Sequence, residues 1–323
     1  MKRVVWVHTF NDKFMNSGVF MHQLFDQINK SQFTVEYYYI GNSIKDYIKS
    51  YLDLRRKIDK DTILHAQYGS LCGLFTGLFP CKKILTLRGS DWYISPSSSI
   101  KEYLHTRLAV FFTKQSLRYF DRVFVMSFRM KHEIWSKCKI SSVLIPDGID
   151  FKKFYPLDKI SAFSELGLPP TTNPRILFAT ISKTNLIKRY PLAEKAVEIA
   201  RKKIHKLELV LLHNIPHEKM NSFINTCDLI LLTSTHEGFP NIIKEGLACN
   251  KPFLSTDVSD LEILSMIEPS CEVCEADAEV LSEKIIEKFS KHSKVNNLRA
   301  CINYMEIQYI TNKILSEYSN LIK

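Results

Sequence analysis

Short apolar runs that alternate with helical patterns constrain the fold of this chain more than any other feature. Each run is bounded by polar residues, as expected of a strand that is covered on both faces. Between the runs, apolar residues recur every three to four positions, which is typical of helices that pack on a sheet. Strands separated by helices predict βαβ units, an α/β class with parallel sheets, and ligands at the carboxyl ends of the strands. The expected strands are residues 4–8, 33–40, 62–66, 83–87, 122–126, 143–145, 176–181, 207–212 and 229–232.

A turn-rich segment near the middle of the chain predicts a domain boundary. Residues 145–150, IPDGID, combine the Pro, Gly and Asp residues that end one element and turn the chain into the next. A chain of 323 residues also fits two domains of about 150 residues better than one. We therefore expect a first domain over residues 1–155 and a second over 156–302. Apolar residues at helical spacing predict a final helix within residues 303–323.

The stretch 237–257, EGFPNIIKEGLACNKPFLSTD, follows the last expected strand and opens a helix. Pro240 suits the first helical position because its φ is already helical and its missing N–H would be unpaired there. The amides of Asn241 and Ile242 are then free donors at the positive end of the helix dipole, a combination suited to phosphate. The sequence therefore predicts an anion site at the start of this helix.

Two carboxylates flank the predicted anion site. Glu237 precedes the helix, and Glu245 lies eight residues later, about two turns further at 3.6 residues per turn. Carboxylates accept hydrogen bonds from hydroxyls, which a sugar and a ribose offer on either side of a diphosphate. On spacing alone, an amphipathic helix with two solvated glutamates is an equal alternative.

Glu237 and Glu245, with Gly238-Phe239-Pro240-Asn241 between them, resemble the E-x7-E signature of family 4 glycosyltransferases of the GT-B fold. The similarity continues through residues 248–257, and residues 145–150 resemble the hinge segment of the same family. The resemblance implies two Rossmann-like domains that face a cleft, with the last helix returning to the first domain. It also implies transfer of a sugar, with retention of configuration, from a nucleoside diphosphate sugar to a saccharide or lipid-linked acceptor. Such reactions build polysaccharides and glycoconjugates.

The same resemblance assigns roles to individual residues. Glu245 would accept hydrogen bonds from the ribose, Glu237 from the donor sugar, and the loop Gly238-Phe239-Pro240 would deliver the amides of Asn241 and Ile242 to the phosphate. Lys188 matches a lysine that neutralises the diphosphate as charge develops on it. A solvated loop lysine is the alternative for Lys188.

Other positions depart from the family pattern. Thr180-Ile181 stands where the family has a Gly-Arg pair, so Lys183 is the candidate for the missing cation, with a solvated lysine as the alternative. Gly18 is expected to let the first strand–helix turn approach a ligand closely, although the family often has two glycines there. A family histidine is replaced by Arg88, which leaves Asp91 as the catalytic candidate on the acceptor side or, alternatively, as a turn cap.

Positive charge is concentrated in the first half of the chain. Residues 1–155 carry 24 Lys and Arg against 13 Asp and Glu, a formal charge of +11, whereas the remainder carries −1. Such a half attracts nucleic acid, anionic lipid or an anionic substrate, but no nucleic-acid-binding motif accompanies it. The helix expected over residues 100–120 fits either an anionic bilayer surface or a core helix. Its relevant cations are Lys101, Arg107, Lys114 and Arg118, and its core candidates are Leu104, Leu108, Phe111 and Phe112.

Composition narrows the remaining possibilities. No window approaches 18 uninterrupted apolar residues, and the N-terminal apolar run is far shorter than that of a signal peptide. We therefore expect a cytoplasmic protein. The basic first half, together with the family resemblance, implies peripheral contact at the inner face of the membrane. The eight scattered cysteines form neither a disulfide framework nor a metal motif. We expect no metal or cofactor besides the nucleotide sugar, with UDP favoured over GDP. The rivals are a nucleotide-sugar epimerase on the same fold and a non-catalytic, basic membrane-binding module.

Overall fold

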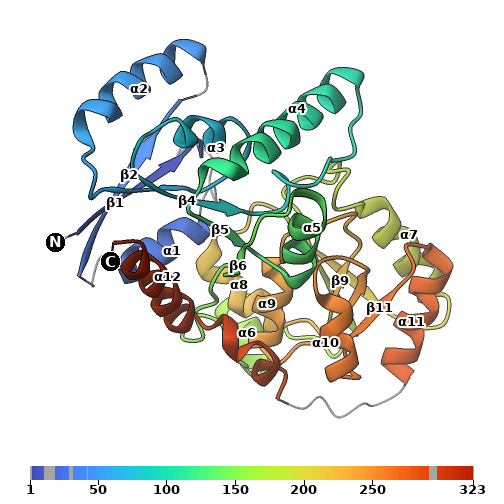
Figure 1. The fold of residues 1–323 in the computed structure, drawn as a ribbon. Helices are drawn as coiled ribbons and strands as arrows, with labels where there is room; N and C mark the ends of the chain where they lie inside the picture. The colour runs from blue at the N-terminus through green and yellow to red at the C-terminus, as the bar shows by residue number, and fades with distance from the viewer. Residues whose placement is uncertain (1, 11–18, 29–31, 42, 291–296, 323) are drawn as a thin grey trace. The chain divides into compact units, whose positions relative to one another are not determined.

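The computed structural model describes residues 2–10, 19–28, 32–41, 43–290 and 297–322. The chain divides into two compact units (Figure 1). The first unit comprises Met1–Gly148 and Ile307–Lys323, and the second comprises Ile149–Glu306. Each unit is built on one parallel sheet with helices between successive strands. The predicted α/β class with two Rossmann-like domains is confirmed.

The first unit contains a six-stranded sheet in the order β2-β1-β3-β4-β5-β6. Every pair in it is parallel, and β1 lies between β2 and β3. The strands are β1 (Lys2–His8), β2 (Phe33–Tyr39), β3 (Ile63–Ala66), β4 (Lys82–Leu87), β5 (Arg122–Val125) and β6 (Val143–Leu144).

Helices cover both faces of this sheet because alternate side chains of each strand point to opposite faces. Val5 and Val7 of β1 contribute to the core on one face, together with residues from α2 (Ile44–Lys57), α3 (Ser70–Gly77), the short η1 (Leu117–Tyr119) and α5 (Phe128–Cys138). Val4 and Trp6 contribute to the core on the other face, with α1 (Val19–Ile28) and α12 (Ile307–Leu321). The last helix of the chain is therefore part of the first unit.

The helix α4 (Ile100–Ser116) packs differently from the core helix that its large apolar residues indicated. Leu104, Leu108 and Phe111 are each more than half exposed. The inward positions of α4 are Val110, Thr113 and Ser116, which are small. These small side chains meet the glycines of the α3 segment: a Cβ on Gly69 would lie 2.5 Å from Thr113 Oγ1, and one on Gly73 would lie 3.0 Å from Ser116 Oγ. The close approach of the two helices leaves no room for large residues between them, so the core-helix alternative is wrong for Leu104, Leu108 and Phe111.

The second unit contains a five-stranded sheet in the order β11-β10-β9-β7-β8, again with parallel pairs throughout. Its strands are β7 (Arg175–Ala179), β8 (Glu208–Leu212), β9 (Leu229–Leu232), β10 (Phe253–Thr256) and β11 (Glu272–Cys274). Its helices are α6 (Lys159–Glu165), α7 (Tyr190–Arg201), the short η2 (His217–Lys219), α8 (Met220–Asn225), α9 (Asn241–Ala248), α10 (Leu261–Ile267), α11 (Ala278–Ser290) and the 3-10 segment η3 (Leu298–Met305).

Within the described parts of the chain, no helix is both long and apolar enough to cross a membrane. All eight cysteines are free thiols, and four of them are buried.

Candidate functional site

The strand order of the second sheet reverses between β7 and β9. From β7 the chain first adds β8 on one side and then returns to add β9 on the other. Ligands of doubly wound sheets bind outside the carboxyl ends of the strands at such a reversal. Two loops leave these carboxyl ends: residues 180–189 after β7 and residues 233–240 after β9. Both belong to the second unit.

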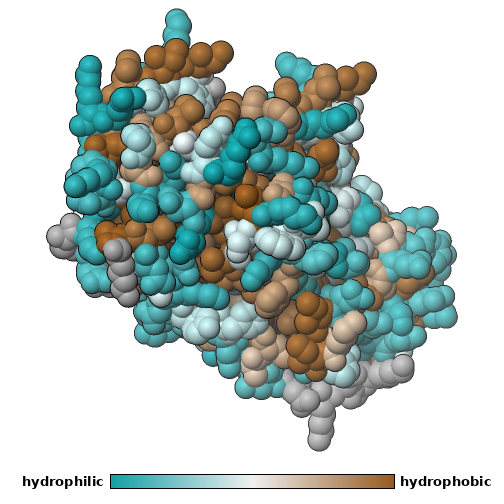
Figure 2. Space-filling view, viewed as in Figure 1, coloured by the Kyte–Doolittle hydropathy of each residue, from teal (hydrophilic) through white to brown (hydrophobic). Residues whose placement is uncertain are grey.

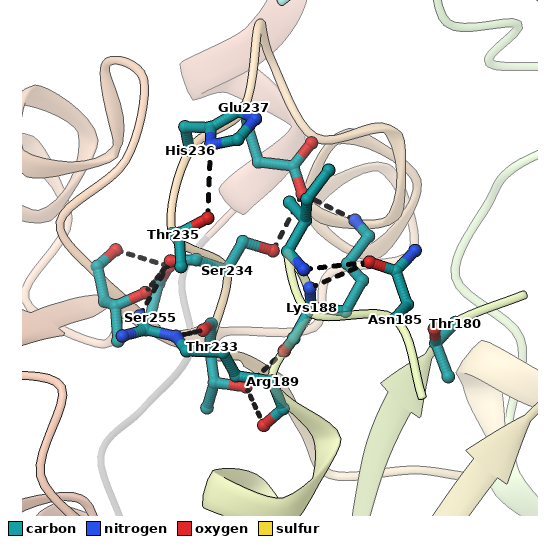
Figure 3. A network of polar contacts seen from close by, with 12 residues as sticks. Thr180, Asn185, Lys188, Arg189, Thr233, Ser234, Thr235, His236, Glu237 and Ser255 are labelled. Carbon is teal, nitrogen blue, oxygen red and sulfur yellow. Dashed lines mark hydrogen bonds and ion pairs between the residues drawn. The ribbon is translucent and has the colours of Figure 1, made fainter. Parts of the chain in front are cut away.

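The two loops meet through a salt bridge between Lys188 and Glu237 (Figure 3). Lys188 Nζ lies 2.6 Å from Glu237 Oε1, and the Ser234 hydroxyl donates to the same oxygen at 2.8 Å. The side chains of Lys188 and Glu237 are 23% and 17% exposed, so the pair is largely shielded but still accessible from one side. The structure thus brings together two residues that are 49 positions apart in the sequence.

Arg189 fastens the two loops to each other below this ion pair. Its guanidinium donates to the carbonyl oxygens of Thr233 and Ser234, at 2.5 and 2.9 Å. The Thr233 hydroxyl donates in return to the carbonyl of Lys188 at 2.7 Å. Arg189 has a φ of 50°, a left-handed conformation that is uncommon for a residue with a side chain. Arg189 is a site residue that the motifs did not predict, and its position next to Lys188 is the only feature of the sequence that indicates it.

The start of α9 supplies backbone donors next to Glu237. Pro240 is the N-cap and not the first helical residue: its ψ of 121° is extended, and its carbonyl accepts from the Ile243 and Lys244 amides. Among the described residues, the amides of Asn241 and Ile242 have no acceptor. The expectation that Pro240 is the first helical residue is therefore wrong by one position, since α9 begins at Asn241. The amides of Asn241 and Ile242 still lie at the start of the helix.

Gly238 and Phe239 form the turn that precedes the cap. The Ser259 hydroxyl donates to the carbonyl of Gly238 at 2.6 Å, which holds the turn against the segment after β10. Phe239 is 7% exposed, and Lys244 Nζ lies 5.9 Å from the centre of its ring. His236 lies just before the turn, with its Nδ1 within hydrogen-bonding distance of Thr235 Oγ1 at 3.1 Å. Burial lowers the pKa of the His236 imidazole.

Glu245 lies further along α9, and its side chain is 10% exposed. His217 Nε2 is 3.5 Å from Glu245 Oε1, and the His217 ring lies edge-on to Phe154 at 5.4 Å between ring centres. His217 was not expected at the site, because it comes from η2, in a different βα connection. A carboxylate has about four lone-pair sites, so Glu245 beside His217 retains acceptor capacity for hydroxyls.

The predicted donor-site residue Lys183 and the nearby Thr180 have different surroundings. Lys183 is exposed, and its Nζ lies 5.0 Å from the centre of the Tyr190 ring, a cation–π contact. The Thr180 side chain turns back on its own loop and donates to the carbonyl of Ser182 at 2.8 Å. Gly18 lies outside the described residues.

Asp91, in the first unit, is fully buried. Its carboxylate accepts hydrogen bonds from the amides of Gly69, Arg88 and Gly89 at 2.8 to 2.9 Å, which ties the loop after β3 to the loop after β4. Burial raises the pKa of the Asp91 carboxyl, and these amide donors oppose the rise. The contacts are those of the turn cap that the sequence left open as an alternative.

Arg88 is also engaged within the first unit. Its guanidinium forms an ion pair with Asp147 and donates to the backbone and side-chain oxygens of Gln67 at 2.9 and 3.0 Å. His65, one strand away, bonds Tyr318 and Thr86 at 2.7 Å each, and burial lowers the pKa of its imidazole to about 3.

Within the described ranges, no group of three or more His, Cys, Asp and Glu side chains is placed to hold a metal ion.

Comparison with known proteins finds similarity to glycosyltransferases. Residues 189–290 match the family described as "Glycosyl transferases group 1". This segment contains Arg189, the loop 233–240 and all of α9. A curated relative from Methanocaldococcus jannaschii, called an uncharacterized glycosyltransferase, is 26% identical over 228 residues. The match spans 66% of this chain and 62% of that protein.

Solved structures share the whole architecture. Sucrose-phosphate synthase from Thermosynechococcus elongatus has a TM-score of 0.76 at 15% identity, with 99% of both chains covered. Anabaena HepE, solved in complex with UDP and glucose, has a TM-score of 0.72 at 12% identity, with 99% of this chain and 100% of that chain covered. A glycosyltransferase from Rickettsia africae has a TM-score of 0.70 at 17% identity, over 99% and 98% of the two chains. At these identities the likeness establishes the fold, which is GT-B.

Proposed function

We propose that this chain is a retaining glycosyltransferase that moves a sugar from a nucleoside diphosphate sugar to a saccharide or lipid-linked acceptor. The observation that carries the proposal is the Lys188–Glu237 pair beside two free amides at the start of α9. One cation, two backbone donors and a helix dipole within one site suit a diphosphate. The family match over residues 189–290 and the complex of HepE with UDP and glucose support the same class of reaction.

Each side chain of the second unit has a distinct part in this proposal. The amides of Asn241 and Ile242 bind a phosphate oxygen. Glu245, further along α9, accepts hydrogen bonds from the ribose hydroxyls, with His217 as its neighbour. Glu237 accepts from the donor sugar once Lys188 has turned to the diphosphate. In the free protein, the Lys188–Glu237 salt bridge holds both groups ready.

Lys188 provides the chemistry of the leaving group. As the oxygen of an acceptor hydroxyl bonds to the anomeric carbon, the bond from that carbon to the β-phosphate oxygen breaks. Negative charge collects on the diphosphate, and the proton of the acceptor hydroxyl passes to the departing phosphate oxygen. A lysine and helix amides that are already in place stabilise this charge without reorganising. We propose that they do so without a divalent metal. Lys183 is the less favoured second cation because it lies on the Tyr190 ring.

The acceptor is proposed to bind the first unit, which carries the excess of positive charge. Asp91 shapes this unit by joining two loops at the carboxyl ends of β3 and β4, and a direct contact between Asp91 and the acceptor remains a prediction. The donor is proposed to be a UDP sugar, and the pathway polysaccharide or glycoconjugate assembly at the cytoplasmic face of a membrane.

A screen of nucleoside diphosphate sugars by thermal unfolding tests the donor class. UDP and GDP sugars are compared with the free sugars and with nucleoside monophosphates. A true donor present at 100 times its Kd adds about 2.7 kcal/mol of stability. With a donor identified, the anomeric configuration of the product, read by NMR coupling constants, tests retention. If no nucleoside diphosphate sugar raises the unfolding temperature, the proposal is wrong.

A further inference from the structure

Two helices of the first unit present rows of large apolar side chains to solvent. On α2 the row repeats every fourth residue, and on α4 it repeats with helical spacing over three turns. The exposed fractions are 81%, 59% and 52% for Ile44, Ile48 and Leu52, and 80%, 52%, 53% and 52% for Ile100, Leu104, Leu108 and Phe111. These seven residues are called the α2–α4 face. Figure 2 shows hydrophobic residues at the surface over both helices, mixed with hydrophilic ones.

Both rows lie on the same side of the first sheet. Tyr47 and Tyr51 on the inner side of α2 meet the rings of Phe75 and Phe79, at 5.7 and 5.0 Å between centres. The opposite flank of α3 packs on the small inward residues of α4, such as Thr113. The helix α3 therefore lies between α2 and α4 (Figure 1), and the outward rows of these two helices flank it.

The packing of α4 makes this exposure a specific feature of the chain. A helix usually buries its large apolar residues and exposes its small polar ones. In α4 the order is reversed, because Gly69 and Gly73 of the α3 segment lie so close to Thr113 and Ser116 that only small residues fit there. Leu104, Leu108 and Phe111 are each more than half exposed, so they do not belong to the core of the first unit.

Cations accompany both rows. Lys45, Lys49, Arg55 and Arg56 lie on α2, and Lys101, Arg107 and Lys114 lie on α4, all of them exposed. The acidic residues of the two helices are engaged locally. Asp46 completes the N-terminal capping box of α2, Asp53 pairs with Lys57 at 2.8 Å, and Glu102 accepts from the amide and hydroxyl of Ser98.

We propose that the α2–α4 face docks on the surface of an anionic lipid bilayer. Aliphatic side chains flanked by Lys and Arg fit the boundary between acyl chains and anionic headgroups. Charge complementarity favours this occupant. Among the described residues, the acidic groups of α2 and α4 are held by Ser43, Lys57 and Ser98, whereas the lysines and arginines named above lie exposed beside the face. The proposal deepens the proposed function by placing the enzyme where a lipid-linked acceptor resides, and a protein partner becomes an outcome of the test.

Co-sedimentation with vesicles of defined composition tests the docking. The full chain is mixed, without any sugar nucleotide, with vesicles of equal parts phosphatidylglycerol and phosphatidylcholine, or of phosphatidylcholine alone. We expect binding to the anionic vesicles at low salt and release at high salt, since the Debye length shrinks to about 3 Å at 1 M.

Paired variants separate the apolar from the electrostatic contribution. Ile48→Ser with Leu104→Ser should weaken binding to anionic vesicles by about tenfold or more, since each side chain inserts apolar area. Lys49→Gln with Arg107→Gln should weaken it by about 25-fold at low salt, on the order of fivefold for each cation. The matched controls change residues of the second unit that are exposed to a similar extent. These control proteins should bind as the wild type does. They are Ile160→Ser with Ile263→Ser, and Lys202→Gln with Lys203→Gln.

Three outcomes would overturn the proposal. Wild-type protein that stays in the supernatant with anionic vesicles at low salt excludes docking. Control pairs that lose as much affinity as the face variants show that binding is not localised. The third outcome is a wild-type protein that forms a concentration-dependent dimer and does not bind vesicles. If the double variant Ile48→Ser with Leu104→Ser is then a monomer, the face binds a second copy of the chain. None of these results changes the outcome of the thermal screen for donors. The docking proposal can therefore fail while the proposed function stands, and the reverse.

Discussion

Replacing Lys188 by methionine separates the structural from the catalytic part of the Lys188–Glu237 pair. The two charged atoms are 2.6 Å apart, and the side chains are only 23% and 17% exposed. Exposed ion pairs contribute about 0 to 1 kcal/mol, whereas loss of one partner of a buried pair costs about 3 to 5 kcal/mol. For this intermediate exposure we expect Lys188→Met to lower the free energy of unfolding by about 2 kcal/mol. Ser234 still donates to Glu237 and limits the loss.

The same change should affect turnover much more than stability. Loss of one preorganised group that stabilises transition-state charge lowers kcat by about 10²- to 10³-fold. The double variant Lys188→Met with Glu237→Gln removes the unpaired carboxylate. It should recover about 1 kcal/mol of unfolding free energy relative to Lys188→Met, because the two residues are coupled. It should not recover turnover, because no cation faces the leaving diphosphate.

Urea unfolding and initial-rate kinetics are measured on wild type, Lys188→Met, Glu237→Gln and the double variant, which together form a double-mutant cycle. Lys202→Met, an exposed lysine of the same unit, is the control and should change neither quantity. If the double variant regains turnover together with stability, Lys188 acts only by holding the loops. A kcat of Lys188→Met within about threefold of wild type, about 0.65 kcal/mol, would likewise refute the leaving-group role.

Three further predictions address the packing, the pH dependence and the metal requirement. A Cβ on Gly246 would lie 1.8 Å from Ile230 Cδ1, so Gly246→Ala should lower the free energy of unfolding in urea by about 1 to 3 kcal/mol. Adding Ile230→Val removes Cδ1 and should restore most of the lost stability. No recovery would contradict this packing. Burial lowers the pKa of His65 to about 3, so between about pH 6.5 and 3 the unfolded chain binds a proton at His65 that the folded chain does not bind. The free energy of unfolding should therefore fall as pH drops through this window, by at most about 1.4 kcal/mol per pH unit. The difference in this free energy between wild type and His65→Gln should narrow over the same window, and a constant difference would contradict the lowered pKa. Transfer should persist in EDTA, because Lys188 and the start of α9 carry the leaving-group charge; loss that Mg²⁺ or Mn²⁺ restores would show that a metal shares it.

The sequence was sufficient for the features that depend on local pattern. Apolar runs placed the strands of both sheets up to β9, because a strand covered on both faces must be apolar at successive positions. The stretch 237–257 was interpreted through its motif, and the strand within it, β10, was not identified, nor was β11 after it. Pro240 was placed one residue too far into the helix, since a proline at the cap and one at the first helical position leave the same local pattern.

Features that depend on a partner element could not be obtained in this way. The interpretation of α4 as a core helix failed because the size of its inward residues is set by the glycines of the α3 segment, about 40 positions earlier. His217 approaches Glu245 only through the packing of η2 and α8 beside α9. The role of Arg189 depends on its left-handed backbone, which directs its guanidinium to the carbonyls of the neighbouring loop. Motif matching identified Lys188 and Glu237 separately, and their contact is a property of the folded sheet.

Calorimetric titration with UDP tests the central claim, that the second unit binds a nucleoside diphosphate at the start of α9. Wild type, Glu245→Ala and Glu237→Ala are compared, with the exposed Glu262→Ala as the control. Hydrogen bonds to a charged group contribute about 1.5 to 3 kcal/mol, so Glu245→Ala should bind UDP about 10- to 100-fold more weakly. Glu237→Ala should bind UDP as the wild type does, because UDP lacks the sugar that Glu237 is proposed to contact. Equal affinity of Glu245→Ala and wild type, or no UDP binding by wild type, would contradict the account.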